Sequence, residues 1–182
     1  MMLEKQDKIT WEVSYLDGAF ASAKKRGSKV GKTKKGKGTK IMVAVDGNGI
    51  PLAIVTEAAN VSEYKLALKT VDEISVAKRP NHPKKRPENI VGDRGYDAKW
   101  LRKSMRQRRM KPFIPKRRKK GQKEEPRYNK RVKDMYKTRW IVERTNAWLQ
   151  NYRRITVRWD KLADSYEAFI ELGCILICLR RV

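Results

Sequence analysis

The stretch KIMVAVDGNGIPLAIVTEAAN, residues 40–60, sets the expected fold of this chain. It consists of two apolar runs joined by Asp46-Gly47-Asn48-Gly49. Asp-Gly and Asn-Gly pairs supply the positive φ angles that tight turns require, so the stretch predicts a β-hairpin. Asp46 ends an apolar run, but because its neighbours form the turn we assign it a structural role.

The segments around this hairpin predict one strand before it and alternating helices and strands after it. Residues 11–23, WEVSYLDGAFASA, have the composition of a strand and suit an antiparallel meander with the hairpin. Ser62 and Asp97 are each placed to cap a helix that follows. The other predicted elements are a helix at 62–74, a short strand at 90–92, a helix at 98–109, a short edge strand at 111–116, and helices at about 128–153 and 165–179.

This order of elements predicts an α/β fold. Helical crossovers connect parallel strands, whereas the meander is antiparallel, so the sheet is expected to be mixed and flanked by helices. A five-stranded sheet of this kind is the ribonuclease H-like arrangement. With 182 residues, of which 40% are apolar, the chain can bury one core, and we expect a single domain over residues 1–182.

The charge of the chain indicates a polyanionic partner. Forty-five Lys and Arg against twenty Asp and Glu leave a formal charge of +25, which favours nucleic acid over a membrane surface. No run approaches the roughly 20 apolar residues that span a bilayer. Cys174 and Cys178 lie one helical turn apart in an apolar run, and we interpret them as core sulfur in preference to a thiol pair or half a zinc site. A cytoplasmic location is therefore expected.

Two basic segments are expected to be flexible loops that contact DNA phosphates. The first, at about 24–40, is rich in Gly and Lys and lacks acidic residues, and the second lies at about 116–127. Gly27 and Gly31 do not form a phosphate-binding loop, because three residues separate them where the motif needs four. The predicted DNA-binding residues are Lys24, Lys25, Arg26, Lys32, Lys34, Lys35, Arg94, Arg117, Arg118, Arg153 and Arg154.

Three carboxylates occupy positions from which functional side chains could project. Asp17 closes the apolar run VSYL, Asp93 ends NIVG, and Glu143 lies among bulky apolar residues of the long helix. Helical spacing places Tyr136, Arg139 and Glu143 on one stripe. The simpler alternatives are a turn residue for Asp17, and a surface ion pair with Arg139 for Glu143. In the same way, we interpret Asp97 as a helix cap and the single His82 as a solvated loop residue.

The motifs that contain these acids resemble those of DDE-type transposases from bacterial insertion sequences. LDGAF resembles the first acidic motif of this family, GDRGYD the second, and RWIVERTNAWLQNYRRI the third. Tyr136, Arg139 and Glu143 have the intervals of the Y-(2)-R-(3)-E-(6)-K signature, with Gln150 in place of the final Lys. A neutral amide cannot supply the cationic DNA contact of that Lys, and Arg153 and Arg154 lie close enough to substitute.

The resemblance implies that Asp17, Asp93 and Glu143 bind two divalent ions, Mg²⁺ or Mn²⁺, with Asp17 as the bridging ligand. Three converging carboxylates would otherwise repel one another, and hard cations prefer oxygen ligands. It further implies DNA cleavage at the ends of a mobile element, followed by joining of the 3′ ends to target DNA. Tyr136 is expected to support the site, and Arg139 to contact phosphate or to orient Glu143.

Other functions and partners remain open at this level. A ribonuclease H-class nuclease and a catalytically inactive, basic DNA-binding remnant are the two rival interpretations. We see no DNA-recognition helices before Asp17, so double-stranded DNA is expected to be recognised with an upstream-frame region or as a full-length fusion product. A homodimer on DNA is expected on family grounds. Four tryptophans are assigned either to stacking on an unpaired base or to the core: Trp100, Trp140, Trp148 and Trp159.

Overall fold

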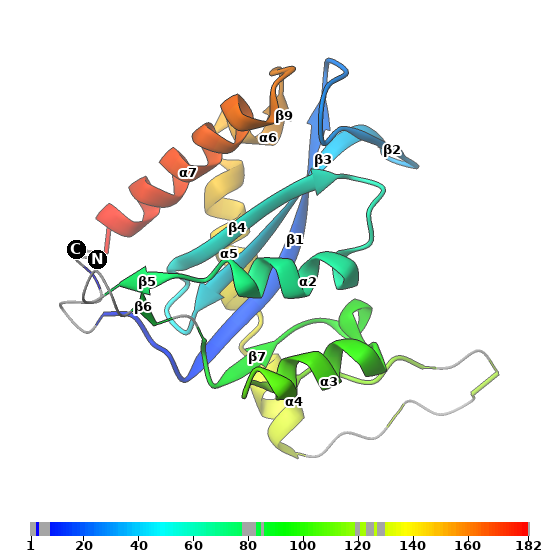
Figure 1. The fold of residues 1–182 in the computed structure, drawn as a ribbon, viewed down its shortest axis with the longest axis vertical. Helices are drawn as coiled ribbons and strands as arrows, with labels where there is room; N and C mark the ends of the chain where they lie inside the picture. The colour runs from blue at the N-terminus through cyan, green and yellow to red at the C-terminus, as the bar shows by residue number, and fades with distance from the viewer. Residues whose placement is uncertain are drawn as a thin grey trace.

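The computed structural model describes residues 3, 8–77, 83–84, 86–118, 121–122, 126 and 130–181. His82 lies outside the described residues, and so does much of the predicted basic loop at 116–127. Helices cover both faces of a central sheet (Figure 1). No helix in the part of the chain that the structure describes is long and apolar enough to cross a membrane.

The central sheet has the mixed topology that the sequence predicts. In the described residues it contains seven strands, with β2-β3-β1-β7-β8 in order, β4 beside β3 and β9 beside β1. The β1–β3 and β3–β4 pairs are antiparallel, and the β1–β7 and β7–β8 pairs are parallel. The strands are β1 (Val13–Ala23), β2 (Gly31–Thr33), β3 (Gly36–Asp46), β4 (Pro51–Ala58), β7 (Asn89–Val91), β8 (Lys111–Phe113) and β9 (Val157–Arg158), with β5 (Val76–Ala77) and β6 (Pro83–Lys84) forming a separate pair.

The helices divide between the two faces of the sheet. One core cluster joins α2 and α3 to side chains such as Leu16 and Met42. A second core cluster joins α5, α6 and α7 to side chains such as Tyr15 and Val43. The helices are α2 (Glu63–Asp72), η1 (Arg94–Tyr96), α3 (Lys99–Gln107), α4 (Lys130–Lys137), α5 (Trp140–Gln150), α6 (Arg153–Thr156) and α7 (Ala163–Leu179).

The five predicted strands correspond to β1, β3, β4, β7 and β8, and the hairpin prediction is confirmed. Asp46 is fully buried, and its carboxylate accepts hydrogen bonds from the amides of Thr10, Asn48 and Ile50 at 2.7 to 2.9 Å. Gly49 has a φ of +84°, the positive value that the turn requires. Asp46 is therefore the structural residue that the sequence indicates. The edge position of β8 is also confirmed.

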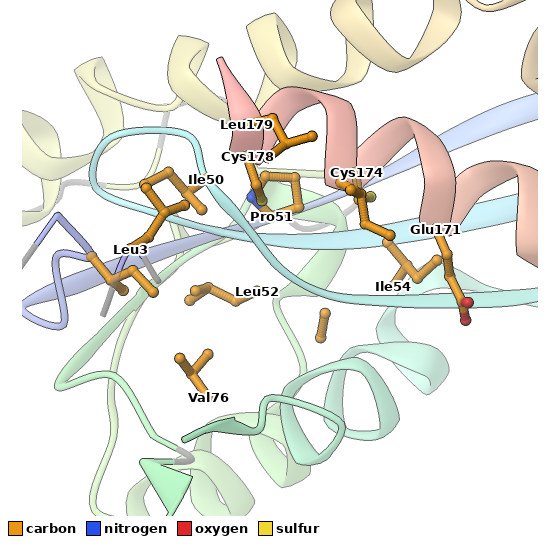
Figure 2. A pocket seen from close by; sticks show the side chains of 13 residues that line it. Leu3, Ile50, Pro51, Leu52, Ile54, Val76, Glu171, Cys174, Cys178 and Leu179 are labelled. Atoms are coloured by element: carbon orange, nitrogen blue, oxygen red, sulfur yellow. The ribbon is translucent and has the colours of Figure 1, made fainter. Parts of the chain in front are cut away.

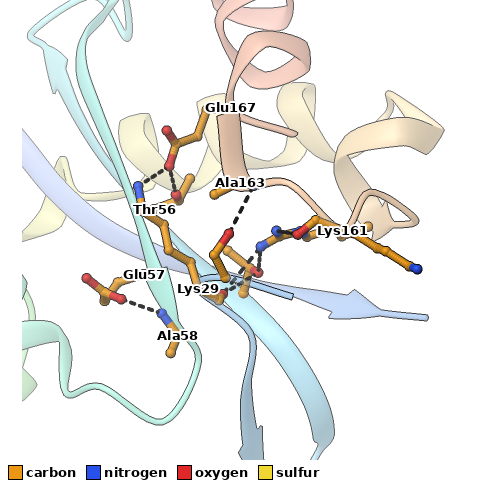
Figure 3. Close-up of polar contacts among 10 residues, drawn as sticks. Lys29, Thr56, Glu57, Ala58, Lys161, Ala163 and Glu167 are labelled. Atoms are coloured by element: carbon orange, nitrogen blue, oxygen red, sulfur yellow. Dashed lines mark hydrogen bonds and ion pairs between the residues drawn. The ribbon is translucent and has the colours of Figure 1, made fainter. Parts of the chain in front are cut away.

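The prediction of a flexible loop at 24–40 needs correction. Its second half forms β2 and the start of β3, so a short hairpin extends the sheet. Arg158 anchors the first half, because this fully buried side chain donates to Thr39 Oγ1 at 2.7 Å and to the carbonyl oxygens of Lys29 and Lys161. Lys29 also binds Glu167 of α7 through its side chain (Figure 3). Glycine content indicated disorder, but Arg158, far along the sequence, supplies the contacts that order this segment.

The predicted long helix at 128–153 is interrupted, which is a second correction. Its described part consists of α4 and α5, separated by Thr138 and Arg139. The Thr138 hydroxyl donates to the carbonyl oxygen of Met135 at 2.8 Å and accepts from the Tyr15 hydroxyl at 2.8 Å. Side-chain bonding back to the preceding turn bends helices. This tertiary contact with β1 explains the break.

Of the two helix-cap predictions, the one for Asp97 is wrong and the position of Ser62 is confirmed. Asp97 does not cap α3, whose N-cap is Ala98. The Asp97 carboxylate instead accepts bonds from the Arg102 guanidinium, at 2.7 and 2.9 Å, and from the amide of Arg117. Ser62 does occupy the N-cap of α2 but makes no side-chain cap bond.

The two cysteines are less buried than core sulfur would be. Cys174 and Cys178 are both half-buried, and they line an apolar cavity of about 410 Å³ between α7 and β4 (Figure 2). Leu52 and Ile54 of β4 line the opposite wall. Both thiols are free, and burial raises the pKa of Cys174 to about 12, so neither the disulfide nor the thiolate needed for a zinc site is favoured.

Candidate active site

Asp17 projects from the middle of β1 toward α5. The sequence placed it at the end of a strand, but β1 continues for six residues beyond it to Ala23, which corrects that expectation. Side chains alternate along a strand, so Asp17 shares a face with Tyr15, which packs in the α5 cluster, whereas Gly18 shares a face with Leu16, which packs in the α2 cluster. The strand thus presents adjacent residues to different helices.

Two side chains of the α4–α5 region contact the Asp17 carboxylate. Arg139 Nη1 lies 3.5 Å from Asp17 Oδ1, and Asn146 Nδ2 donates to Asp17 Oδ2 at 3.0 Å. Burial raises the pKa of Asp17 to about 6, and Arg139 opposes that rise while the carboxylates of Glu63 and Asp93 add to it. The carboxyl group is therefore held where its ionised form is destabilised and a cation would be favourable.

Asp93 follows β7 on the same side of the sheet. The parallel register ends where Tyr15 pairs with Val91, two residues before Asp17 and Asp93, and the Asp93 carboxylate lies near enough to contribute to the raised pKa of Asp17. The Asp93 carboxylate begins the 3₁₀ turn η1 by accepting from the amide of Gly95 at 2.7 Å. The turn thus orients Asp93, and the structure brings this pair of predicted site residues together.

The Glu143 carboxylate forms an ion pair with Arg139, which also contacts Asp17. The Glu143 side chain is 50% exposed and forms an ion pair with Arg139, the arrangement that the alternative interpretation predicted. The same guanidinium reaches Asp17, so Arg139 connects two of the three predicted acids. Within the described ranges, no three Asp, Glu, His or Cys side chains are grouped closely enough to hold a metal ion.

The remaining signature residues lie around this centre. Tyr136 is half-buried, with its ring centroid 5.7 Å from the Arg139 guanidinium carbon, and so lies where a supporting residue is expected. Gln150 is exposed at the end of α5. Arg153 and Arg154 are exposed on α6, and Arg154 forms an ion pair with Asp160 at 2.8 Å.

The predicted DNA-binding residues are exposed but lie on several parts of the molecule. Lys24, Lys25 and Arg26 follow β1, and Lys32, Lys34 and Lys35 belong to the β2–β3 hairpin. Arg94 lies in η1, beside Asp93. Arg117 and Arg118 follow β8, which is next to β7. The structure therefore places Arg94 at the acidic centre and the hairpin lysines farther along the sheet.

The tryptophans are largely outside the core. Trp100, Trp140 and Trp159 are 44 to 52% exposed, so a core role is wrong for these three. Trp148 is half-buried, and the guanidinium carbons of Arg144 and Arg181 lie 4.7 and 4.9 Å from its ring centroid. Arg144 also lies 4.9 Å from the ring centroid of Trp140.

Sequence reasoning missed three residues of this centre: Glu63, Tyr96 and Asn146. Glu63 begins α2 and accepts a hydrogen bond from the Tyr96 hydroxyl at 3.1 Å. Asn146 follows Glu143 by one helical turn, a spacing that could have indicated it. The first residue of α2 carries no comparable signal, because its approach to β1 depends on tertiary packing.

The chemistry of the donors fits a hard divalent cation on the Asp17 side. Asp17 on β1 and Asp93, which follows β7, offer carboxylate oxygens that interact electrostatically. Asn146 Oδ1 is buried and has no hydrogen-bond partner among the described residues, although its Nδ2 is bound to Asp17. Oxygen donors of this kind suit Mg²⁺ or Mn²⁺.

Comparisons with known proteins agree with this site. The sequence profile of the family described as "Transposase DDE domain" matches residues 9–179. A relative from Burkholderia cepacia, named "Putative transposase for insertion sequence element IS402", is 38% identical over 142 residues, which are 78% of this chain. The chain spans 63% of the length of that relative.

Solved structures share the fold at low sequence identity. A piggyBac transposase synaptic complex with hairpin DNA matches with a TM-score of 0.54 at 12% identity, covering 91% of this chain and 46% of that one. A simian T-cell lymphotropic virus intasome with the PP2A regulatory subunit B56 gamma matches with a TM-score of 0.52 at 12% identity, covering 91% and 48%. These likenesses confirm the ribonuclease H-like fold. Together with the acidic centre on β1 and β7, the family match means that this chain belongs to the DDE transposase family.

Proposed function

We propose that this chain is the catalytic domain of a transposase that cleaves DNA at the ends of a mobile element and joins the freed 3′ ends to target DNA. The observation that carries the proposal is the placement of Asp17 beside the end of β7, where Asp93 follows, with Arg139 linking Asp17 to Glu143. Family membership supports it, because DDE transposases are generally catalytic.

Asp17, Asp93 and Glu143 are the proposed ligands of divalent cations, as the DDE family implies. When bound, Mg²⁺ or Mn²⁺ supplies Lewis acidity at phosphorus and lowers the pKa of water. For Glu143 to serve as a ligand, its carboxylate must leave Arg139. The released guanidinium then has its donors available for a DNA phosphate, which gives Arg139 the phosphate contact predicted from the sequence.

The proposed reaction has two displacements at phosphorus. In the first, water forms the new P–O bond and the bond to the 3′ oxygen breaks, which leaves a 3′-hydroxyl. In the second, that hydroxyl forms a bond to the phosphorus of a target phosphodiester, and the bond from this phosphorus to the 3′ oxygen of the target strand breaks, which leaves a 3′-hydroxyl on the target. Asp17 acts from β1, Asp93 from the turn that follows β7, and Glu143 from α5, so the chain contributes positioning and charge.

DNA is the proposed partner because the chain carries a formal charge of +25. Contacts from lysines and arginines to phosphates bind without reading sequence. Arg94 is the predicted DNA-binding residue nearest the acidic centre, since it directly follows Asp93. Recognition of element ends by a further region and dimer formation on DNA remain predictions.

The test is Asp93→Asn, assayed on DNA that carries the terminal sequences flanking the gene. We expect loss of Mg²⁺-dependent cleavage together with wild-type, salt-sensitive DNA binding. Asp164→Asn, at the start of α7, is the matched control and should cleave normally. Normal cleavage by Asp93→Asn would reject the site.

Cleavage of RNA–DNA hybrids without any end joining would instead indicate the ribonuclease H-class nuclease. Inactivity of the wild-type chain on every substrate, with DNA binding intact, would favour the inactive remnant.

A further inference from the structure

Glu63, the first residue of α2, presses its carboxyl group against the backbone of β1 next to Asp17. A Cβ atom added to Gly18 would lie 2.7 Å from Glu63 Cδ and 3.0 Å from its Oε1, closer than real side chains approach. Gly18 therefore permits this contact. Glu63 lies on the α2 side of the strand, and Asp17 extends from the adjacent position to the α5 side.

The same carboxylate holds the turn that carries Asp93. The Tyr96 hydroxyl donates to Glu63 Oε2 at 3.1 Å, and Tyr96 is fully buried. Tyr96 closes the η1 turn that Asp93 begins, and its amide donates to the Asp93 carbonyl oxygen at 3.2 Å. A movement of Tyr96 would therefore move Asp93.

Lys40 fixes the other oxygen of Glu63. Its Nζ lies 3.5 Å from Glu63 Oε1 and donates to the carbonyl oxygen of Val61 at 2.8 Å. Lys40 belongs to β3, which pairs with β1 along its length. Glu63 is thus connected to β1 by packing, to β3 by an ion pair and to the Asp93 turn by a hydrogen bond.

We propose that Glu63 is a positioning residue of the active site, which fixes the Asp93 turn against β1 and so sets the separation of the Asp17 and Asp93 carboxylates. The contacts of Glu63 with β1, β3 and Tyr96 form without a bound metal ion. The effect of these contacts on cation binding rests on the proposed function. Residues that hold metal ligands in place typically change metal affinity by roughly 10- to 100-fold when replaced.

The variants separate this role from a general effect on folding. Glu63→Ala removes the acceptor of the buried Tyr96 hydroxyl, whereas Glu63→Gln retains a carbonyl oxygen at the same reach and is expected to rescue. Tyr96→Phe removes the hydroxyl and should reproduce the effect of Glu63→Ala. Glu57→Ala on β4 is the matched control, because within the described part of the chain the Glu57 carboxylate accepts a hydrogen bond from the neighbouring amide of Ala58 and does not contact the Asp93 turn.

The first measurement needs no metal. Hydrogen exchange of the Gly95, Tyr96 and Asp97 amides, which bond within the turn, should become about tenfold faster in Glu63→Ala and Tyr96→Phe. It should stay near the wild-type rate in Glu63→Gln and Glu57→Ala. Unchanged exchange in Glu63→Ala would overturn the inference. So would faster exchange that is spread equally over β3 and α7, because that pattern indicates a loss of global stability.

The second measurement is calorimetric titration of the full chain with Mn²⁺ at neutral pH. We expect roughly tenfold weaker binding by Glu63→Ala and wild-type binding by Glu63→Gln. Equal Mn²⁺ affinity of wild type and Glu63→Ala would overturn the role of Glu63 in the site. If the wild type binds no more Mn²⁺ than Asp93→Asn does, the proposed function fails, and the exchange data alone then decide whether Glu63 positions the turn.

Discussion

Arg139 places Nη1 3.5 Å from Asp17 Oδ1, so a cation already lies beside this half-buried carboxylate. The same guanidinium is paired with Glu143. Two of the three acids that the sequence assigns to metal binding are thus paired with one basic side chain of the protein. The positive charge of Arg139 reduces the repulsion between these carboxylates. In the proposed function, a divalent cation takes the place of Arg139 beside them.

Replacement of Arg139 should alter the ionisation of Asp17. Arg139 opposes the effect of burial, so the pKa of Asp17, about 6 in the wild type, should rise in Arg139→Ala. Arg139→Lys keeps the positive charge and should show a smaller change. Carboxyl carbon chemical shifts followed through a pH titration measure it. An Asp17 pKa that stays the same or falls in Arg139→Ala would contradict the contact.

Stability should depend on pH through Asp17. Its pKa in the folded protein, about 6, lies above the ordinary value of 3.8, so the folded state binds the proton more tightly than the unfolded state. The stabilisation is complete below about pH 4 and is lost as pH rises through 6, with a maximum of about 3 kcal/mol. Asp17→Asn should remove this component. Urea unfolding of both proteins between pH 4 and 7.5 checks it, and parallel pH profiles would contradict it.

Arg158 is expected to be important for stability. It is fully buried and bonds to Thr39 and to the carbonyl oxygens of Lys29, Asp160 and Lys161. Arg158→Ala should lower the free energy of unfolding by about 3 kcal/mol, because it leaves a cavity and several unpaired acceptors.

Proteolysis at the neighbouring basic segment gives a second measurement for Arg158. Residues 24–26 should be cleaved by trypsin faster in Arg158→Ala than in the wild type, since their anchor is lost. Arg154→Ala is the control, because its side chain is exposed and its pairing with Asp160 is a surface contact. Equal unfolding free energies for Arg158→Ala and wild type would refute the anchoring role.

Gly18 should tolerate no larger residue while Glu63 is present. Gly18→Ala places a methyl group against Glu63 Cδ, and overpacking of this kind costs roughly 1–3 kcal/mol. In the double variant Gly18→Ala/Glu63→Ala most of this cost should disappear. A double-mutant cycle of unfolding free energies measures the coupling, and additive effects would show that the two residues do not touch.

Much of the fold could be predicted because local patterns decide it. The hairpin around Asp46 and the helix at α7 follow from turn residues and apolar runs. The break at Thr138 could not be predicted, since it depends on a bond to Tyr15, more than a hundred residues away. Similarly, β2 pairs with β3 in a segment whose glycines favour disorder, and Arg158, far along the sequence, binds Lys29 before β2 and Thr39 in β3.

For the candidate site, the sequence identified the acidic residues of the motifs but not all of their partners. Asp17 and Asp93 were identified from their motifs, and the Asp93 carboxylate lies near enough to raise the pKa of Asp17. The sequence did not indicate that Asp17 lies mid-strand, and it indicated the pairing of Glu143 with Arg139 only as the alternative to metal binding. Glu63 was missed because only the packing of α2 on β1 brings it there. Motif spacing locates side chains along the chain, whereas their partners depend on contacts between distant elements.

The buried turn at Asp46 has an effect far from where it lies. It fixes how β3 aligns with its neighbours, and β1 is paired to β3 residue by residue, with Asp17 opposite Val43. A slip of one position would rotate Asp17 toward α2 and bring glycine to face Arg139. The Asp46 carboxylate therefore maintains the strand alignment that places Asp17, and disruption of this distant turn should alter the candidate site while leaving every motif intact.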